Sequence, residues 1–469
     1  MAHFYIAAAH KSSGKTSISI GLAAAMAKQG LAVQPFKKGP DYIDPLWLTR
    51  AAGQDCYNLD FFTMSHAEIL STFICGGADA DISLIEGNKG LYDGLAVDGA
   101  DSNAALAKML AAPVVLVIDT GGMTRGIAPL IRGYLDFDPE INICGVILNK
   151  VGGARHERKL RAALERYTDV EVLGAIGRDR TLEIPERHLG LVPANEADRA
   201  DSMIERLSEV VSASVDVDRL ITIAGTAPIP DSNSKSSVET LPKLDVRIAI
   251  ARDAAFGFYY PDDLRAFAAA GAELVPFDAL NDPHLPDADG LFIGGGFPET
   301  HLESLAGNQG LLTDIRQKLA AGLPAYAECG GMMYLAQSIQ WQDEKHAMAG
   351  VVPGNIFVAA RPQGRGYVRL EETGKNLWPA RPHNEQDSGH DIPAHEFHYA
   401  RLENISNGNE FAYQVNRGHG IDGHHDGLII GNLVAGFAHH RNTKADPWVE
   451  RFVAFVRETS QNTSSGDSP

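Results

Sequence analysis

Short apolar runs alternate with helical patterns along the first half of the chain. Residues 16–30 and 100–110 have the apolar spacing of helices. The strand-length apolar runs cover residues 4–9, 32–37, 82–88, 113–120, 143–151 and 170–176. Strands that are apolar at nearly every position are typical of a parallel sheet with helices on both faces. We therefore expect a doubly wound α/β domain over residues 1–224.

The alternation stops at a polar stretch and then starts again. Residues 225–243 are rich in proline, serine and asparagine, which predicts a linker between domains. Further apolar runs and helical patterns cover residues 246–252, 262–270, 273–277, 290–295, 309–321 and 325–328. They predict a second α/β domain over residues 244–457. Residues 458–469 are rich in serine and threonine, and we expect a disordered tail there.

Composition limits the class of protein. The chain has 469 residues, of which 44% are hydrophobic and 22% charged, so it can form two globular domains. Its four cysteines form no CxxC pair, which fits a reducing cytoplasm. The chain has no signal-peptide pattern and no apolar run of about 20 residues, so we expect a cytoplasmic protein without membrane contact. The net charge of -19 repels nucleic acid, and an anionic substrate would need a local basic pocket.

A connection near the N-terminus carries a phosphate-binding pattern. Ser13-Gly14-Lys15-Thr16 follows the first apolar run and opens a predicted helix. In a P-loop, backbone N–H groups at the helix N-terminus bind phosphate oxygens, the lysine adds a positive charge, and the hydroxyl ligates Mg²⁺. The usual first glycine is replaced here by Ala9. We expect all four residues to bind ATP and Thr16 to be a ligand of Mg²⁺ as well.

Carboxylates follow the neighbouring predicted strands. Asp41 and Asp44 come after the run at residues 32–37, Glu86 lies at the end of the next run, and Asp93 lies seven residues beyond Glu86. The carboxyl ends of strands in such a sheet face the ligand crevice, and Mg²⁺ requires oxygen ligands. Each residue alone could be a helix cap or a turn residue. Together, beside a P-loop, they predict a nucleotide and Mg²⁺ site, with Glu86 as a metal ligand.

Cys329 lies where a short predicted strand turns into a helix. Its neighbours two positions away, Ala327 and Gly331, are small, as the crowded turn of a nucleophile elbow requires. The N-terminus of the following helix favours the thiolate form. A buried structural cysteine is the alternative, but the small flanking residues favour a nucleophile.

A nucleophilic thiolate needs a histidine that the fold brings close. The apolar run at residues 431–438 ends in His439 and His440, and we choose His439, with His440 as its nearest competitor. Residues 294–299, Gly-Gly-Gly-Phe-Pro-Glu, follow a predicted strand, and their amides either stabilise an oxyanion or form a tight turn. The other histidines in this part of the chain are expected in loops or on the polar surface: His395, His398, His419, His424 and His425.

These motifs together resemble the cobyrinic acid a,c-diamide synthases over nearly the whole chain. The stretches that carry the resemblance are residues 13–16, 35–45, 58–60, 86–94, 255–260, 295–299, 326–331 and 395–399. The resemblance implies an N-terminal synthetase domain of the dethiobiotin synthetase type and a C-terminal domain of the class I glutamine amidotransferase type. It also implies ATP, glutamine and a tetrapyrrole polycarboxylate as substrates. It leaves the oligomeric state open, with a homodimer as one outcome.

The resemblance also assigns roles to residues. Cys329 would attack the glutamine amide, and His439 would act as base and acid. Asp41, Asp44, Glu86 and Asp93 fall on carboxylates that the family uses for nucleotide, Mg²⁺ or substrate. Members phosphorylate a ring acetate and amidate it through an acyl phosphate.

Other interpretations are kept beside this one. Glutaminases of this class often carry an acid two residues after the histidine, where this chain has Arg441, so a cysteine–histidine pair is expected. Relatives that amidate siroheme share the same motifs, so the ring is not decided. A partitioning or switch ATPase would carry a lysine where this chain has His10. A binding protein with a degenerate glutaminase domain would not need both Cys329 and His439.

Overall fold

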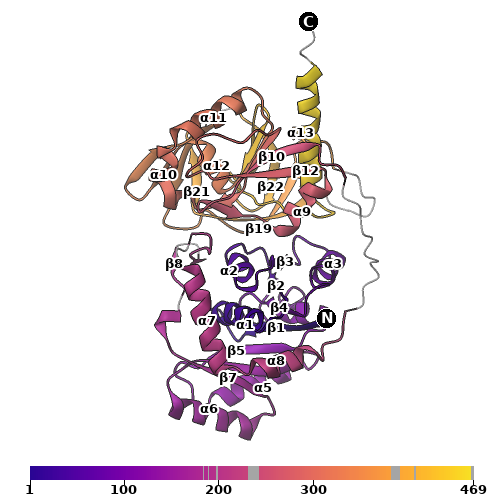
Figure 1. Cartoon of the computed structure of the whole chain (residues 1–469), viewed down its shortest axis with the longest axis vertical. Coiled ribbons are helices and arrows are strands. Elements are labelled where there is room, and N and C mark those ends of the chain that lie inside the picture. Colours follow the sequence, from indigo (N-terminus) through magenta and orange to yellow (C-terminus); the bar gives the residue numbers. More distant parts are fainter. Residues whose placement is uncertain are drawn as a thin grey trace. The chain divides into compact units, whose positions relative to one another are not determined.

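A computed structural model describes residues 1–469 except 183, 188–189, 197–198, 231–241, 382–390, 406–407 and 466–469. The chain divides into an N-terminal unit, Met1–Ser237, and a C-terminal unit, Val238–Pro469. Each unit has its own central sheet and its own apolar core (Figure 1). Much of the predicted linker, residues 231–241, lies outside the described residues.

The central sheet of the N-terminal unit is parallel throughout. Its seven strands have the order β3-β2-β4-β1-β5-β6-β7. The strands are β1 (Ala2–Ala8), β2 (Val33–Lys38), β3 (Tyr57–Leu59), β4 (Ile82–Glu86), β5 (Val114–Asp119), β6 (Ile143–Val151) and β7 (Val172–Gly177). In a parallel sheet all carboxyl ends lie along one edge, so residues that follow β1, β2 and β4 gather there.

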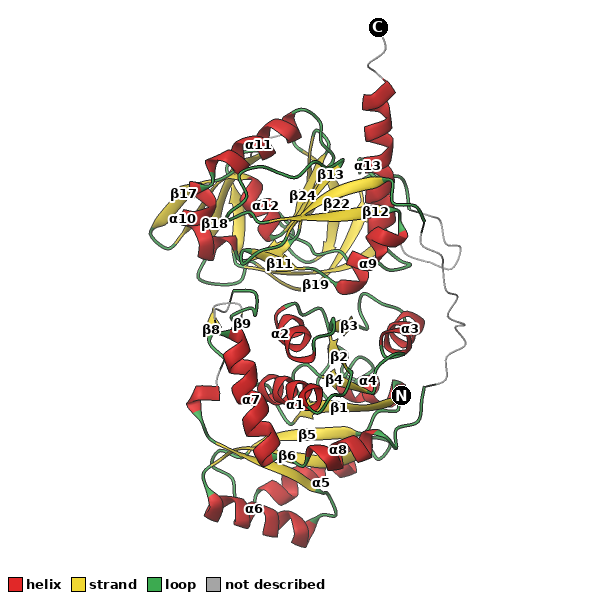
Figure 2. Cartoon of the chain, in the orientation of Figure 1, coloured by secondary structure: helices red, strands yellow, loops and turns green. Residues whose placement is uncertain are grey.

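Helices cover both faces of this sheet (Figure 2). Alternate side chains of β1 enter different cores: Phe4 and Ile6 face one, and Tyr5 and Ala7 face the other. The first core is closed by α1 (Lys15–Lys28), α2 (Ile43–Ala52), α7 (Ala200–Ser214) and α8 (Val217–Ala224). The second is closed by α3 (His66–Gly76), α4 (Asn103–Met109), α5 (Ile127–Phe137) and α6 (Ala154–Tyr167). Because strand side chains alternate in direction, the near-continuous apolar runs supply both cores.

The central sheet of the C-terminal unit is mixed. Its order is β12-β10-β13-β15-β24-β23-β22-β19-β20, parallel from β12 to β24 and antiparallel beyond. The parallel strands are β12 (Ala272–Phe277), β10 (Val246–Ala251), β13 (Gly290–Ile293), β15 (Ala325–Glu328) and β24 (Leu433–Gly436). The antiparallel strands are β23 (His425–Ile430), β22 (Glu410–Arg417), β19 (Gly364–Glu372) and β20 (Asp391–His398). Strand β24 thus lies beside β15, although about a hundred residues separate them in sequence.

Smaller elements complete both units. One face of the mixed sheet packs on α9 (Pro261–Ala269) and α13 (Trp448–Ser465), and the other on α10 (Leu302–Gly307), α11 (Gln309–Ala320) and α12 (Gly330–Leu335). The minor elements are η1 (Arg180–Leu182), β8 (Glu186–Arg187), β9 (Gly190–Leu191), β11 (Phe256–Phe258), β14 (Gly295–Gly296), η2 (Pro298–His301), β16 (Ala336–Trp341), β17 (Glu344–Ala347), β18 (Val352–Val358) and β21 (Ala400–Glu403).

The C-terminal segment differs from the sequence prediction. A disordered tail was expected from residue 458, but helix α13 continues to Ser465. The buried apolar side chains of Trp448, Val449, Phe452, Val453 and Val456 anchor the helix. The polar residues from Arg457 onward extend it, and no Gly or Pro among them stops it. Among the described residues, no helix is both long enough and apolar enough to cross a membrane.

Candidate active sites in the two units

The P-loop bends sharply between β1 and α1. Gly14 precedes α1 with a φ of 89°, a left-handed conformation that glycine adopts without strain. A methyl group on Gly14 would lie 2.2 Å from Nδ2 of Asn149, which donates a hydrogen bond to the Ser13 carbonyl at 2.8 Å. Asn149, at the end of β6, therefore braces the loop from a distant part of the sequence. The sequence analysis did not identify it.

Lys15 is the buried lysine of this loop. Its Nζ donates to the carbonyl of Lys89 at 2.8 Å. Burial, together with the nearby charge of Lys37, lowers the pKa of Lys15 to about 8. A phosphate group would supply the negative charge that this ammonium group requires.

A cluster of charged side chains lies beside Thr16. The Thr16 hydroxyl donates to Glu86 Oε1 at 3.0 Å and to Asp44 Oδ2 at 3.3 Å. Lys37 Nζ lies 2.5 Å from the same Asp44 oxygen and 2.6 Å from the same Glu86 oxygen. Burial alone would lower the pKa of Lys37, but Asp44, Glu86 and Asp41 outweigh it and raise the pKa above its usual value. Lys37, to which the sequence pattern assigned no role, is thus the cation of this cluster.

The donor set of the cluster fits a divalent cation. Glu86 is fully buried, and its Oε2 atom makes no hydrogen bond. Thr16 and Asp44 contribute further hard oxygens next to it. A buried carboxylate oxygen without a partner is costly, and Mg²⁺ prefers oxygen ligands of this kind. The residues therefore suit Mg²⁺.

The remaining two predicted carboxylates are placed differently. Asp41 Oδ1 accepts hydrogen bonds from the amides of Ile43 and Asp44 at 2.9 and 3.3 Å, so Asp41 fixes the start of α2. Its other oxygen lies 3.7 Å from Lys37 Nζ, at the margin of the cluster. Asp93 is exposed, and its carboxylate accepts from the amide of Gly90 at 2.9 Å. It therefore lies in a turn that follows β4, where it holds the amide of Gly90.

Cys329 forms a strained turn between β15 and α12. Its φ of 51° and ψ of -107° are rare for a residue with a side chain, and such strain concentrates at functional sites. Its amide donates to the carbonyl of Gly436 at 2.7 Å. A methyl group on Gly331 would lie 2.1 Å from the Ile293 carbonyl, so the flanking position must be glycine. Only 7% of Cys329 is exposed.

His439 lies next to Cys329 because β24 runs beside β15. The Cys329 side chain is close enough to the ring to raise its pKa. Burial opposes a charged ring, but Cys329 and Glu328 outweigh it and raise the pKa of His439 to about 10. Such a pair can exist as thiolate and imidazolium, which is the reactive form of a cysteine nucleophile.

The competing histidine has another partner. His440 Nδ1 lies 2.6 Å from Asp446 Oδ2, and both residues are buried. Arg441, at the position where an acid was considered, pairs with Asp262 at 2.6 Å and lies over the Tyr260 ring. The site geometry therefore favours His439 over His440 as the partner of Cys329.

Two histidines that were expected in loops or on the surface are buried in β20. His395 is stacked on His439, with ring centroids 4.8 Å apart and planes 17° apart. Burial, aided by the charges of His439 and Arg441, lowers the pKa of His395 well below its usual value. His398 is stacked on Phe437 at 4.0 Å. The prediction was wrong for both residues because β20 could not be recognised as a strand of this sheet.

The glycine loop lies against the same site. Gly295 and Gly296 form β14, and a methyl group on Gly295 would lie 2.6 Å from Cε1 of His439. A methyl group on Gly330 would lie 3.0 Å from the amide nitrogen of Gly296. The amide of Gly296 therefore lies close to Gly330, the residue that follows Cys329. An oxyanion requires such backbone donors.

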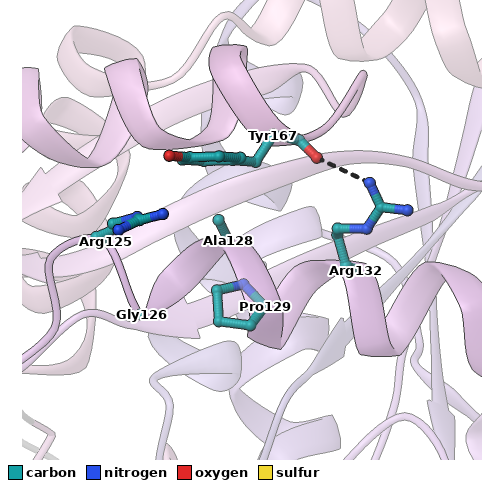
Figure 3. A pocket seen from close by; sticks show the side chains of 6 residues that line it. All are labelled: Arg125, Gly126, Ala128, Pro129, Arg132 and Tyr167. Carbon is teal, nitrogen blue, oxygen red and sulfur yellow. Dashed lines mark hydrogen bonds between the residues drawn. The ribbon is translucent and has the colours of Figure 1, made fainter.

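A separate cavity of about 410 Å³ opens between the start of α5 and the end of α6 (Figure 3). Arg125 lies over the ring of Tyr167 at 5.1 Å, and Arg132 donates to the Tyr167 carbonyl at 3.3 Å. None of the predicted site residues lines this cavity.

Comparison with known proteins places the chain in a family. A family model described as the CobQ/CobB/MinD/ParA nucleotide binding domain matches residues 5–192, and a CobB/CobQ-like glutamine amidotransferase domain matches residues 247–446. The curated cobyrinate a,c-diamide synthase of Magnetococcus marinus is 45% identical over 460 residues, which cover 97% of both chains. The chain belongs to the cobyrinate a,c-diamide synthase family.

Further members of the cobyrinate a,c-diamide synthase family match to a similar extent. The protein of Archaeoglobus fulgidus is 41% identical and covers 94% of both chains. That of Methanosarcina acetivorans is 40% identical over 92% of this chain and 91% of its own. The family, the two-domain α/β fold and the glutamine-dependent ligase class predicted from the sequence are confirmed.

Proposed function

We propose that the chain is a cobyrinate a,c-diamide synthase, which converts acetate carboxylates of a corrin precursor into amides with ATP and glutamine. The observation that carries the proposal is that one chain holds both a P-loop with a buried carboxylate cluster and a cysteine–histidine elbow. The similarity of the chain to proteins named cobyrinate a,c-diamide synthase extends over both of these sites.

In the N-terminal unit, the P-loop amides and Lys15 hold the phosphates of ATP. Thr16, Asp44 and Glu86 would hold Mg²⁺, which would withdraw charge from the phosphates. Lys37 shares oxygens with these residues and balances their negative charge. A substrate carboxylate attacks the terminal phosphorus, ADP leaves, and an acyl phosphate is formed. We assign Asp41 to positioning the start of α2. We assign Asp93 to a turn beside the P-loop, and this turn would contact the nucleotide or the substrate.

An anionic substrate needs positive charge that the chain as a whole does not supply. Lys15, Lys37 and Lys38 are buried at the edge of the sheet where the substrate would bind. Burial lowers the pKa of Lys38, and its Nζ lies 5.9 Å from the centre of the Phe61 ring. Because Lys15 is assigned to the phosphates and Lys37 to the carboxylate cluster, Lys38 is the one of these three lysines that is left to attract a substrate carboxylate.

In the C-terminal unit, the Cys329 thiolate attacks the side-chain amide of glutamine. The carbonyl oxygen becomes an oxyanion held by the amides near Gly296 and Gly330. When the C–N bond breaks, His439 gives its proton to the leaving nitrogen and ammonia is formed. Water then adds to the thioester, His439 takes its proton, and glutamate leaves. Ammonia attacks the acyl phosphate, and phosphate departs to leave the amide.

A substrate comparison tests the proposal. Purified protein is incubated with ATP, Mg²⁺ and glutamine, and either cobyrinic acid or siroheme is added. The proposal expects a diamide of cobyrinic acid by mass spectrometry, with one ADP formed for each amide. Amidation of siroheme with no reaction of cobyrinic acid would overturn it. ATP hydrolysis without any amide would favour a switch ATPase instead.

A further inference from the structure

The acid partner of His439 comes from an unexpected place in the chain. Glu328 is the last residue of β15 and directly precedes Cys329. Its Oε1 atom lies 3.3 Å from Nδ1 of His439, and the residue is 3% exposed. The contact forms because Glu328 is opposite Gly436 in the parallel pair of β15 and β24, and His439 follows three residues later.

The carboxylate of Glu328 is held on its other side too. Its Oε2 atom accepts a hydrogen bond from the hydroxyl of Tyr326 at 2.9 Å. Tyr326 and Glu328 are two residues apart, so they project from the same face of the strand. The Tyr326 ring is stacked on Phe292 with planes 7° apart and touches Trp378 edge to face. A rigid aromatic cluster thus fixes one carboxylate oxygen and leaves the other for the imidazole.

The position that carries the acid in many such glutaminases cannot do so here. Arg441, two residues after His439, is a cation and is paired with Asp262. Asp446 is already the partner of His440. Glu328 is therefore the carboxylate that the fold gives to His439.

The geometry also fixes the orientation of the imidazole. Glu328 is at Nδ1, and His395 is stacked on one face of the ring. Cε1 of the ring points at Gly295. This arrangement leaves Nε2 as the ring nitrogen for the Cys329 sulfur. A hydrogen bond at one nitrogen fixes the tautomer in which the other nitrogen takes a proton.

We propose that Glu328 is the positioning carboxylate of a Cys329–His439–Glu328 triad, in which the acid directly precedes the nucleophile in sequence. Its carboxylate orients the imidazole through Nδ1. The thiol proton moves to Nε2 of His439, later passes to the leaving nitrogen, and is replaced from the water that cleaves the thioester. The inference depends on the glutaminase roles of Cys329 and His439, but not on which ring is amidated.

Replacement of Glu328 tests the proposal through glutamate release from glutamine. Glu328→Gln keeps the shape but removes the charge, and its glutaminase kcat should fall about 100-fold, the scale of a lost acid–base arrangement. The KM for glutamine should change little, and amidation with ammonia should remain. Glu328→Asp keeps the charge with a shorter reach, and its loss should be smaller.

The pH profile separates positioning from a structural role. Glu328 helps to raise the pKa of His439, so the activity that Glu328→Gln retains should decline at a lower alkaline pH than that of the wild type. Glu328→Asp should keep the wild-type decline. Asp446→Asn, which removes a buried carboxylate from the neighbouring His440, is the matched control and should leave the profile in place.

Three results would overturn the inference. The first is wild-type glutaminase activity in Glu328→Gln. The second is an equal loss in Glu328→Gln and Glu328→Asp with an unchanged pH profile. The third is the same shift in Asp446→Asn. Cys329→Ala distinguishes these failures from failure of the proposed function, because glutamate release that persists in that variant would refute the thiolate mechanism itself.

Discussion

Replacement of Gly295 by alanine tests whether His439 acts from its observed place. A methyl group at this position would lie 2.6 Å from His439 Cε1, whereas ordinary contact begins at 3.4 Å. The methyl carbon and Cε1 must therefore move apart by about 0.8 Å. The φ of Gly295 is not left-handed, so the backbone conformation would accept alanine. The obstacle to a methyl group is the crowding by His439, with Phe258 Cβ 3.3 Å away as a second tight contact. The ring cannot retreat freely, because His395 is stacked on it and Glu328 holds Nδ1.

A displacement of this size should be costly for catalysis. A shift of about 1 Å in a catalytic group can reduce a rate by about 100-fold, which corresponds to about 2.7 kcal/mol of transition-state free energy. We therefore expect Gly295→Ala to lower glutaminase kcat by roughly that factor. Its amidation rate with ammonia should stay at the wild-type level, because that reaction bypasses His439.

The assay compares glutamate release, ammonia-dependent amidation and the thermal unfolding midpoint. Gly307→Ala is the matched control, because a methyl group there would meet no atom within 4 Å. If Gly295→Ala and Gly307→Ala released glutamate equally fast, His439 would not be the residue that assists Cys329.

Three further predictions follow from the same contacts. Cys329→Ala should lose amidation with glutamine and keep amidation with ammonia, whereas Lys15→Ala should lose both; a normal ammonia rate in Lys15→Ala would contradict the phosphate-binding role. Glu86→Gln removes the buried charge of the carboxylate cluster, so the Mg²⁺ concentration needed for half-maximal synthesis should rise about 10-fold or more, and an unchanged Mg²⁺ requirement would argue against Glu86 as a ligand. Because the pKa of His439 in the folded state is raised to about 10, its charged form stabilises the fold fully below pH 6.5, and this contribution is lost as the pH rises toward 10. The unfolding free energy of the wild type relative to His439→Gln should fall across that range, and a constant difference in chemical denaturation would show that His439 is not held as a cation.

The parts of the site that were predictable depend on neighbours in sequence. The P-loop of residues 13–16 and the elbow at Cys329 are local turns, so small residues and a lysine at fixed spacing indicate them. The choice of His439 rested on a strand that ends at the right edge of a sheet. The choice of His439 needed, beyond the local sequence, only the rule that the carboxyl ends of parallel strands share an edge.

The parts that were missed depend on the order of strands. In the sequence, Glu328 is simply the last residue of an apolar strand. Its proximity to His439 becomes visible only once β24 is placed beside β15. Asn149 reaches the P-loop from the end of β6, more than a hundred residues away. His395 was expected in a loop or on the polar surface because its strand belongs to the antiparallel half of the sheet, which the sequence pattern did not reveal. Lys37 looked like the end of a strand, although it is bound by two carboxylates.

The transfer of nitrogen from glutamine to a corrin carboxylate tests the central claim most directly. Cobyrinic acid, ATP and Mg²⁺ are incubated with glutamine labelled with ¹⁵N in the side-chain amide, and the products are measured by mass spectrometry. The account predicts a diamide that carries the label in both amides, and no labelled product with Cys329→Ala. An unlabelled diamide, or cobyrinic acid recovered unchanged while ATP is consumed, would contradict it.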